Sequence, residues 1–153
     1  PLEQQMVRTS TLKDMSRVPA GTAEFPPRMQ AWAKEVAEHR SDRIQNVHKL
    51  VDAGAEILVG SDSPNVGIAA GAGLHRELDQ LAQAGLSASK ILAAATWGNS
   101  RFLDPEAKFG AIKVGWEADL LLVDGDPVAN LNNVHRIVAV WVDGRRVHRT
   151  PRR

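Results

Sequence analysis

The chain has 153 residues, of which 19 are lysine or arginine and 18 are aspartate or glutamate, so its formal net charge is +1. Hydrophobic residues make up 43% and charged residues 24%, a composition that excludes intrinsic disorder of the whole chain. The absence of cysteine excludes disulfides, thiolate-bound zinc and cysteine nucleophiles, and the length is too short for a complete (β/α)₈ barrel, which typically needs about 250 residues.

Composition also bears on location and partners. No stretch approaches the roughly 20 apolar residues of a membrane-spanning helix, and the first residues lack the pattern of a signal peptide. We therefore expect a cytoplasmic protein with no membrane partner. The near-neutral charge argues against a nucleic-acid partner. Six arginines gather toward the C-terminal end, where a solvated tail is expected and a basic binding module is the alternative: Arg136, Arg145, Arg146, Arg149, Arg152 and Arg153.

Helical periodicity begins after a loop-like, proline-containing stretch at residues 1–27. Apolar residues recur at steps of three and four from Met29 to Val51, which predicts one long helix. Gly54 follows at the position where a left-handed residue commonly ends a helix. The apolar run at residues 57–60 is typical of a strand buried on both faces.

Further helices are expected after that strand. The segment 67–73 is rich in Gly and Ala but lacks the ending of a phosphate-binding loop, so it is interpreted as a flexible connection. An apolar stripe from Leu74 to Ala82 predicts a helix that Gly85 closes. Ser87 is a typical N-cap for the next helix, and another helical stretch covers residues 99–103.

The pattern changes to strands after about residue 108. Residues 111–114 alternate, and residues 118–124 form a dense apolar run. Residues 136–143 carry apolar side chains at both alternating positions, so both faces are expected to be buried. Asp143-Gly144 is a strong signal for a two-residue hairpin into a final strand at residues 145–148.

Asp62 is the sharpest candidate for chemistry, because it directly follows the apolar strand. The carboxyl ends of strands in α/β folds face the ligand site, where a carboxylate can bind a metal ion or transfer a proton. The alternative is an aspartate that shapes a turn, since Pro64 and Asn65 follow it. His75 and Glu77 open the next helix. The helix dipole stabilises an acidic residue at a helix N-terminus, and polar groups of a substrate can also dock there.

The remaining histidines give no metal-binding pattern. His39 and His48 lie on the predicted long helix but lack the i, i+4 spacing of a helical zinc site. His135 precedes a predicted strand and His148 lies in the predicted hairpin, and neither has a neighbouring ligand in the sequence. We interpret His39 and His48 as ordinary helix residues.

Several segments, taken in chain order, resemble the C-terminal part of metal-dependent amidohydrolases of the imidazolonepropionase-like and prolidase-like branch. Ile57-Leu58-Val59-Gly60-Ser61-Asp62 resembles the last barrel strand of that family, which ends in Gly-Ser/Thr-Asp. The other matching segments resemble the final barrel helix, the "AGL…AAT…N" segment, the "G-x-I-x-x-G-x-x-ADL…D-x-DP" run and a closing hairpin: residues 74–78, 84–87, 94–99, 110–127 and 142–147.

The resemblance implies an α/β fold, with the last strand and helices of a (β/α)₈ barrel in residues 1–108 and part of a small β-sandwich in residues 109–150. It also implies hydrolysis of a carbon–nitrogen bond in a small amide, cyclic amide or dipeptide-like substrate, by water activated on a divalent metal such as zinc. Asp62 would be the catalytic residue that passes the water's proton to the leaving nitrogen, and it could also ligate the metal. His75 would lie near the substrate.

The family's other metal ligands precede the last strand, yet only 61 residues precede Asp62, and they contain no His-x-His pair. Because catalytic zinc commonly takes three protein ligands, we expect this chain alone to bind zinc weakly and to be inactive. An unpaired strand at residues 57–60 predicts a homo-oligomer or a complementary barrel chain as partner. The alternative function is that of a non-catalytic remnant, an oligomerising structural domain of amidohydrolase origin.

Overall fold

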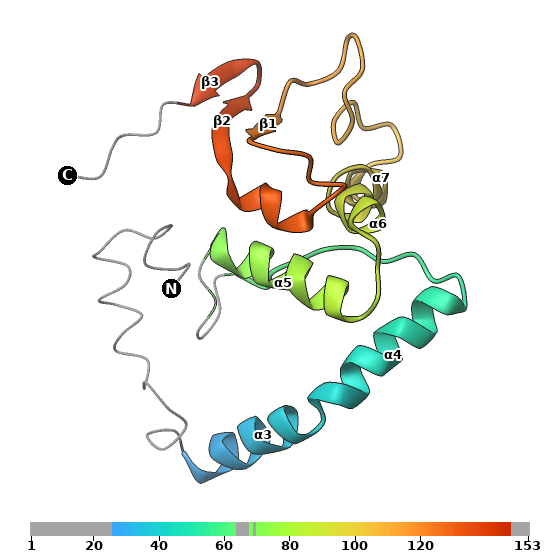
Figure 1. Cartoon of the computed structure of the whole chain (residues 1–153), viewed down its shortest axis with the longest axis vertical. Helices are drawn as coiled ribbons and strands as arrows, with labels where there is room; N and C mark the ends of the chain where they lie inside the picture. The colour runs from blue at the N-terminus through green and yellow to red at the C-terminus, as the bar shows by residue number, and fades with distance from the viewer. Residues whose placement is uncertain (1–25, 64–67, 69, 148–153) are drawn as a thin grey trace, which may run out of the picture. The chain divides into compact units, whose positions relative to one another are not determined.

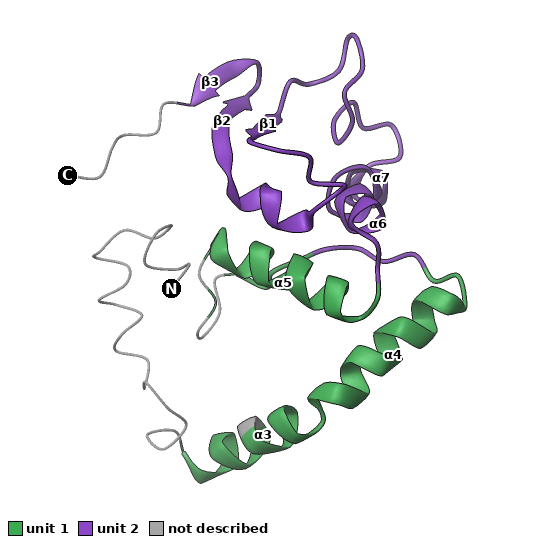
Figure 2. Cartoon of the chain, viewed as in Figure 1, with its two compact units in different colours: residues 1–55, 60–85 green, residues 56–59, 86–153 purple. Residues whose placement is uncertain are grey.

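The computed structural model describes residues 26–63, 68 and 70–147 of the chain. Backbone contacts divide the chain into two compact units, one of residues 1–55 and 60–85 and the other of residues 56–59 and 86–153 (Figure 2). The boundary expected near residue 108, between the barrel part and the β-sandwich part of the family fold, is a different kind of division and stays a prediction. The loop expected at the N-terminus lies almost wholly outside the described residues, as do His148 and three of the six C-terminal arginines.

Two helices, α3 (Pro27–Glu38) and α4 (Arg40–Asp52), replace the single long helix that the periodicity predicts (Figure 1). The break falls at His39, whose φ of −94° and ψ of 20° leave the α-helical region. Proline suits the first position of α3, because a backbone N–H at that position would have no intrahelical acceptor and its absence costs nothing.

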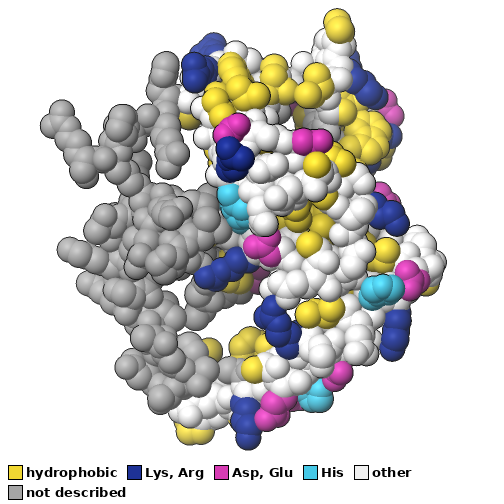
Figure 3. All heavy atoms as spheres, viewed as in Figure 1, with side chains coloured by type: hydrophobic (Ala, Val, Ile, Leu, Met, Phe, Trp, Pro, Cys, Tyr) yellow, Lys and Arg dark blue, Asp and Glu magenta, His cyan; other side chains and the backbone are white. Residues whose placement is uncertain are grey.

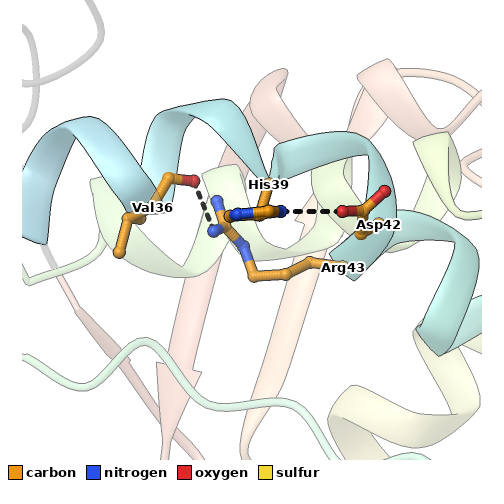
Figure 4. Close-up of polar contacts among 4 residues, drawn as sticks. All are labelled: Val36, His39, Asp42 and Arg43. Carbon is orange, nitrogen blue, oxygen red and sulfur yellow. Dashed lines mark hydrogen bonds and ion pairs between the residues drawn. The ribbon is translucent and has the colours of Figure 1, made fainter.

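Side chains at the break explain the change of direction (Figure 4). The guanidinium of Arg43 donates to the carbonyl oxygen of Val36, so a side chain of α4 reaches a carbonyl in the last turn of α3. Such an intrusion is a recognised cause of helix kinks. Asp42 Oδ2 lies 2.9 Å from His39 Nδ1, and this hydrogen bond holds the pKa of Asp42 below its usual value. Asp42 also lies in the first turn of α4, where the helix dipole favours an acidic side chain.

The predicted end of the long helix is confirmed at Gly54, which has a φ of +82°. The N–H of Gly54 donates to Val51 and that of Ala55 to Leu50, a Schellman arrangement that satisfies the last carbonyls. The next predicted helix is α5 (Ala72–Gln83), and Gly85 follows it at a φ of +88°. Most of the buried side chains of the first unit lie on or just after α5: Ala72, His75, Leu78, Leu81 and Ala84.

The second unit contains one run of consecutive helical segments, α6 (Ala88–Ala93), the π-helical turn η2 (Ala94–Gly98) and α7 (Asn99–Leu103). Ser87 caps α6 as predicted, because its hydroxyl accepts from the N–H of Lys90 at 3.4 Å. Ile91 is fully buried and Ser100 is 1% exposed, so this run supplies the centre of the unit.

The apolar segment at residues 57–60 pairs with no strand among the described residues, so the expected strand is unpaired within them. A side chain takes the place of a neighbouring strand at Val59. The carboxamide of Asn99 accepts from the N–H of Val59 at 3.0 Å and donates to its carbonyl oxygen at 2.7 Å. Residues 57–59, which belong to the second unit, are therefore held by a helix rather than by a sheet.

The strand predicted at residues 111–114 is wrong, because this segment belongs to a loop. The N–H of Glu117 donates to the carbonyl oxygen of Lys108 at 2.7 Å and closes the loop. The ring of Trp116 stacks on Trp97 with centroids 5.7 Å apart, and Lys113 Nζ lies 4.4 Å and 4.9 Å from the two centroids. These contacts anchor the loop to η2 in place of strand pairing.

A three-stranded antiparallel sheet of order β1-β2-β3 completes the second unit: β1 (Leu120–Val123), β2 (Ile137–Val142) and β3 (Arg145–Val147), with the 3₁₀ helix η3 (Leu131–His135) between β1 and β2. Asp143 and Gly144 both have positive φ and form the predicted hairpin turn. Val138 and Val142 are about half exposed, so the expected burial of both faces of β2 is wrong for the described chain.

The described helices are all too short or too polar to cross a bilayer. On the face shown in Figure 3, basic, acidic and histidine side chains intermix along α3 and α4.

Candidate functional site

Asp62 lies in the first unit, in the segment without regular secondary structure that follows residues 57–60. Its side chain is exposed, whereas its neighbours Ser61 and Ser63 are half-buried. Its φ is +52°, in the left-handed region that residues other than glycine rarely adopt. Such backbone conformations persist where the surrounding structure enforces them, and they gather at functional sites. The turn residues Pro64 and Asn65 lie outside the described part of the chain.

The first turn of α5 packs directly against the chain around Asp62. An ideal Cβ atom built on Gly73 would lie 3.1 Å from Ser61 Cβ and 3.2 Å from Ser63 Oγ. The same atom would lie 2.7 Å from Ile68 Cγ2, closer than real Cβ contacts allow. Glycine is therefore needed at position 73, because a side chain there would prevent α5 from packing this closely against residues 61, 63 and 68.

His75 and Glu77 both lie on α5, and the structure gives them different surroundings. His75 is 8% exposed and belongs to the buried face of the helix. Glu77 is half-buried, and the loss of solvent raises the pKa of its carboxyl. The helix-dipole interpretation of Glu77 is wrong, because α5 begins at Ala72 and its first turn holds no acidic residue. A role of His75 near a substrate stays a prediction.

The other described histidines take part in local contacts. His48 Nδ1 lies 2.9 Å from Asp52 Oδ2, one turn further along α4, and His39 contacts Asp42 as described above. His135 is the last residue of η3. Two aspartates of the second unit make structural contacts: Asp119 Oδ1 accepts from the N–H of Asp143 at 2.7 Å, and Asp126 Oδ1 accepts from that of Val128 at 2.8 Å.

The described residues do not fit a complete metal site. Nowhere among them do three histidine, aspartate or glutamate side chains gather closely enough to hold one ion. Asp62 is the one candidate ligand that the sequence places at a strand end, whereas a catalytic zinc ion commonly takes three protein ligands. Any divalent metal at this position would need further ligands from outside the described part of the chain.

The sequence patterns predict no contacts for two residues that make them, Gly73 beside Asp62 and Asn99 beside Val59. The flexible connection predicted at residues 67–73 is wrong for Gly73, which lies inside the first turn of α5. The patterns assign Asn99 to a helical segment and to a family motif, without a contact. The signal that could have drawn attention to Gly73 is its place among good helix formers, since glycine inside a helix is costly without a packing reason.

Comparison with known proteins identifies the class. The amidohydrolase family model matches residues 4–147, and the chain belongs to this family. A proposed prolidase from Bifidobacterium longum is 32% identical over 72% of this chain, with a TM-score of 0.63. A Xaa-Pro dipeptidase solved with methionine in its active site is 25% identical over 90% of the chain, with a TM-score of 0.71. A molinate hydrolase at 19% identity and a TM-score of 0.59 shares the fold over 92% of the chain.

The match covers a minor part of each of these proteins. The chain spans 27% of the Bifidobacterium protein, 32% of the dipeptidase and 35% of the molinate hydrolase. No curated protein matches the chain significantly. The resemblance seen in the sequence is thus confirmed at the level of the family, together with a mixed fold of helices and a small antiparallel sheet.

Proposed function

We propose that the chain is the C-terminal part of a metal-dependent hydrolase that cleaves a carbon–nitrogen bond in a small amide or dipeptide-like substrate. The observation that carries the proposal is the family match over residues 4–147, which includes the segment ending at Asp62. The names of two similar structures, a proposed prolidase and a Xaa-Pro dipeptidase, favour dipeptides with a C-terminal proline as the first substrates to test. In fold terms, residues 57–62 would be the last strand of a (β/α)₈ barrel.

Asp62 has the features of a proton-transfer group in this reaction. Its carboxylate is exposed, so a substrate and a water molecule can reach it. In hydrolysis, the water oxygen forms a bond to the carbonyl carbon and the carbon–nitrogen bond breaks. Asp62 would accept the proton of that water and deliver it to the leaving nitrogen. His75 would help to shape the substrate pocket from the first turns of α5.

The test uses the complete protein, supplied with zinc and offered Xaa-Pro dipeptides, with release of proline as the measurement. The Asp62→Asn variant should lose at least about a hundredfold in kcat, the lower end of what general acid–base groups contribute. Asp52→Asn removes a carboxylate that pairs with His48 on an exposed helix and serves as the control. Full activity in Asp62→Asn, or no hydrolysis of any amide by the metal-loaded protein, would contradict the proposal.

The metal requirement can be tested on this chain directly. We expect weak zinc binding, because Asp62 alone cannot supply a normal ligand set. Equilibrium dialysis with zinc should therefore leave less than one tightly held ion per chain. Stoichiometric zinc that is lost in Asp62→Ala would show that the chain holds a complete site.

A structural role as an oligomerising domain is the second candidate, and the exposed apolar side chains favour it. Four apolar side chains on one face of the sheet are about half exposed, since Leu121 and Val147 both pair with Val140 of β2: Leu121, Val138, Val142 and Val147. An apolar sheet face of this kind is expected where another subunit or a complementary barrel chain binds. Light scattering of the purified chain distinguishes the two cases, because a folded, strictly monomeric 16.6 kDa species would contradict this role.

A further inference from the structure

We propose that Gly73 is a positioning residue for Asp62, because it lets α5 pack against both neighbours of this carboxylate. The catalytic meaning of the inference rests on the proposed hydrolase function. The structural part of it does not, since it concerns the backbone conformation of Asp62 alone.

The space around Gly73 leaves no room for a side chain. A methyl group at this position would meet Ile68 Cγ2 at 2.7 Å, whereas carbon atoms in contact prefer about 3.5–4.0 Å. It would also press on Ser61 Cβ at 3.1 Å and on Ser63 Oγ at 3.2 Å. Gly73 lies within α5, where the helical backbone suits any L-residue. The requirement for glycine is therefore one of space, and the space is taken by Ile68 and by the residues on either side of Asp62.

The backbone of Asp62 also needs support from its surroundings. A φ of +52° is unfavourable for an L-residue, so the surrounding chain must hold it in place. Ser61 and Ser63 are the covalent neighbours of Asp62, and both are half-buried. Because both meet α5 at Gly73, the same contact fixes the chain before and after the strained residue. The exposed carboxylate is then presented from a backbone that is held on both sides.

The experiment compares the backbone of Asp62 in the full chain and in Gly73→Ala by NMR. A left-handed residue has a short distance between its own amide and α protons, which gives a strong intraresidue cross-peak. We expect Gly73→Ala to weaken or split this signal at Asp62, while the backbone chemical shifts of α5 stay helical. A folded Gly73→Ala chain with the left-handed signature of Asp62 intact would overturn the proposal.

A matched control and a double variant separate positioning from general stability. Gly60 lies two residues from Asp62, yet the Cβ added by Gly60→Ala would meet nothing within 4 Å, so Asp62 should keep its signature. Ile68→Ala combined with Gly73→Ala removes the clash at 2.7 Å but leaves the contacts with Ser61 and Ser63, so this variant should fold and still show a weakened or split signature at Asp62. If Gly73→Ala alone does not fold, this double variant decides. A folded double variant with the Asp62 signature intact would show that Gly73 only makes room for Ile68, and a double variant that does not fold would show that Gly73 serves folding; either result overturns the positioning of Asp62.

The complete protein gives a second readout. Gly73→Ala should lower kcat on the order of a hundredfold, as a misplacement of about 1 Å can, with little change in KM. If the protein proves to have no hydrolase activity but the NMR signature of Asp62 responds to Gly73→Ala, the proposed function fails and the positioning contact stands. If activity is present and Gly73→Ala leaves both kcat and the NMR signature unchanged, the positioning inference fails alone.

Discussion

Asn99 and Val59 form a reciprocal pair across 40 residues of sequence, in which one carboxamide satisfies both the N–H and the carbonyl oxygen of one residue. This is the pairing that a neighbouring strand would otherwise provide. The contact is partly buried, and it joins the start of α7 to the apolar segment that resembles a barrel strand.

Replacing Asn99 should therefore show how much stability is lost when the N–H and the carbonyl oxygen of Val59 have no hydrogen-bond partner. Asn99→Leu keeps the approximate size but has no polar atom, so both groups of Val59 lose their partner. We expect the free energy of unfolding to fall by about 1–3 kcal/mol, the usual cost of an unsatisfied buried polar group. Denaturant unfolding measures the loss, and amide hydrogen exchange at Val59 should become faster. Unchanged exchange at Val59 would show that the pair contributes nothing.

Asn99→Asp gives a sharper version of the same test, because protonation restores the missing donor. The ionised carboxylate can accept from the N–H of Val59 but repels its carbonyl oxygen. A protonated carboxyl can do what the carboxamide does. The deficit in stability relative to the parent chain should be largest at neutral pH and shrink toward pH 3. Asn46→Asp on exposed α4 is the control, and a deficit of the same size at both pH values would argue against the two-way pair.

The half-buried carboxyl of Glu77 should make the free energy of unfolding depend on pH. Burial raises the pKa of its carboxyl in the folded chain, so the folded state holds this proton more tightly than the unfolded state does. Stability from this group is then fully present below the usual glutamate pKa and is lost as the pH rises through the raised value. Glu77→Gln should be more stable than the parent at pH 7, and the gain should vanish near pH 4. Unfolding curves at both pH values measure it, with Glu56→Gln as the exposed control.

Alanine substitutions at Gly110 and Gly115, which lie in the same loop, distinguish the effect of backbone strain from that of crowding. Both have positive φ, +83° and +80°, so alanine at either position is strained by about 1–2 kcal/mol. At Gly110 the added Cβ would also lie 2.7 Å from Ser100 Oγ and 2.8 Å from the carbonyl oxygen of Thr96, whereas at Gly115 it would meet nothing within 4 Å. Gly110→Ala should therefore destabilise the chain clearly more than Gly115→Ala in denaturant unfolding. Equal effects would contradict the close approach to Ser100.

Ser87 predicts a capping effect. Ser87→Ala removes the acceptor for the N–H of Lys90 and should lower the free energy of unfolding by about 0.5–1 kcal/mol. Ser87→Asn keeps a capping oxygen and should recover most of the loss. A deficit in Ser87→Asn as large as that in Ser87→Ala would assign the effect to packing rather than to the cap.

Features set by neighbouring residues could be predicted from the sequence. The hairpin at Asp143-Gly144, the helix ends at Gly54 and Gly85 and the cap at Ser87 all follow from the backbone preferences of one or two residues. The kink at His39 could not be predicted, because it depends on a side chain, that of Arg43, which reaches a carbonyl in the last turn of α3.

The candidate site was predictable to a smaller extent. Asp62 could be selected because it follows an apolar run, which is a local pattern. Its left-handed backbone and the contact of α5 at Gly73 could not be selected, because they depend on segments about ten residues apart meeting in space. The loop that closes between Lys108 and Glu117 is a similar case, since the alternating residues inside it mimic a strand while tryptophan stacking decides its path.

The π-helical turn η2 limits where residues can be inserted into the helical run that contains it. Successive residues of an α-helix are about 100° apart around the axis, so the wider turn at Ala94–Gly98 determines which face of α7 carries Asn99. Inserting one residue into α6, before the π-helical turn, would rotate Asn99 by about 100° away from Val59 without altering any side chain that makes the contact. The helical run from Ala88 to Leu103 should therefore accept substitutions at its exposed positions but reject insertions within α6.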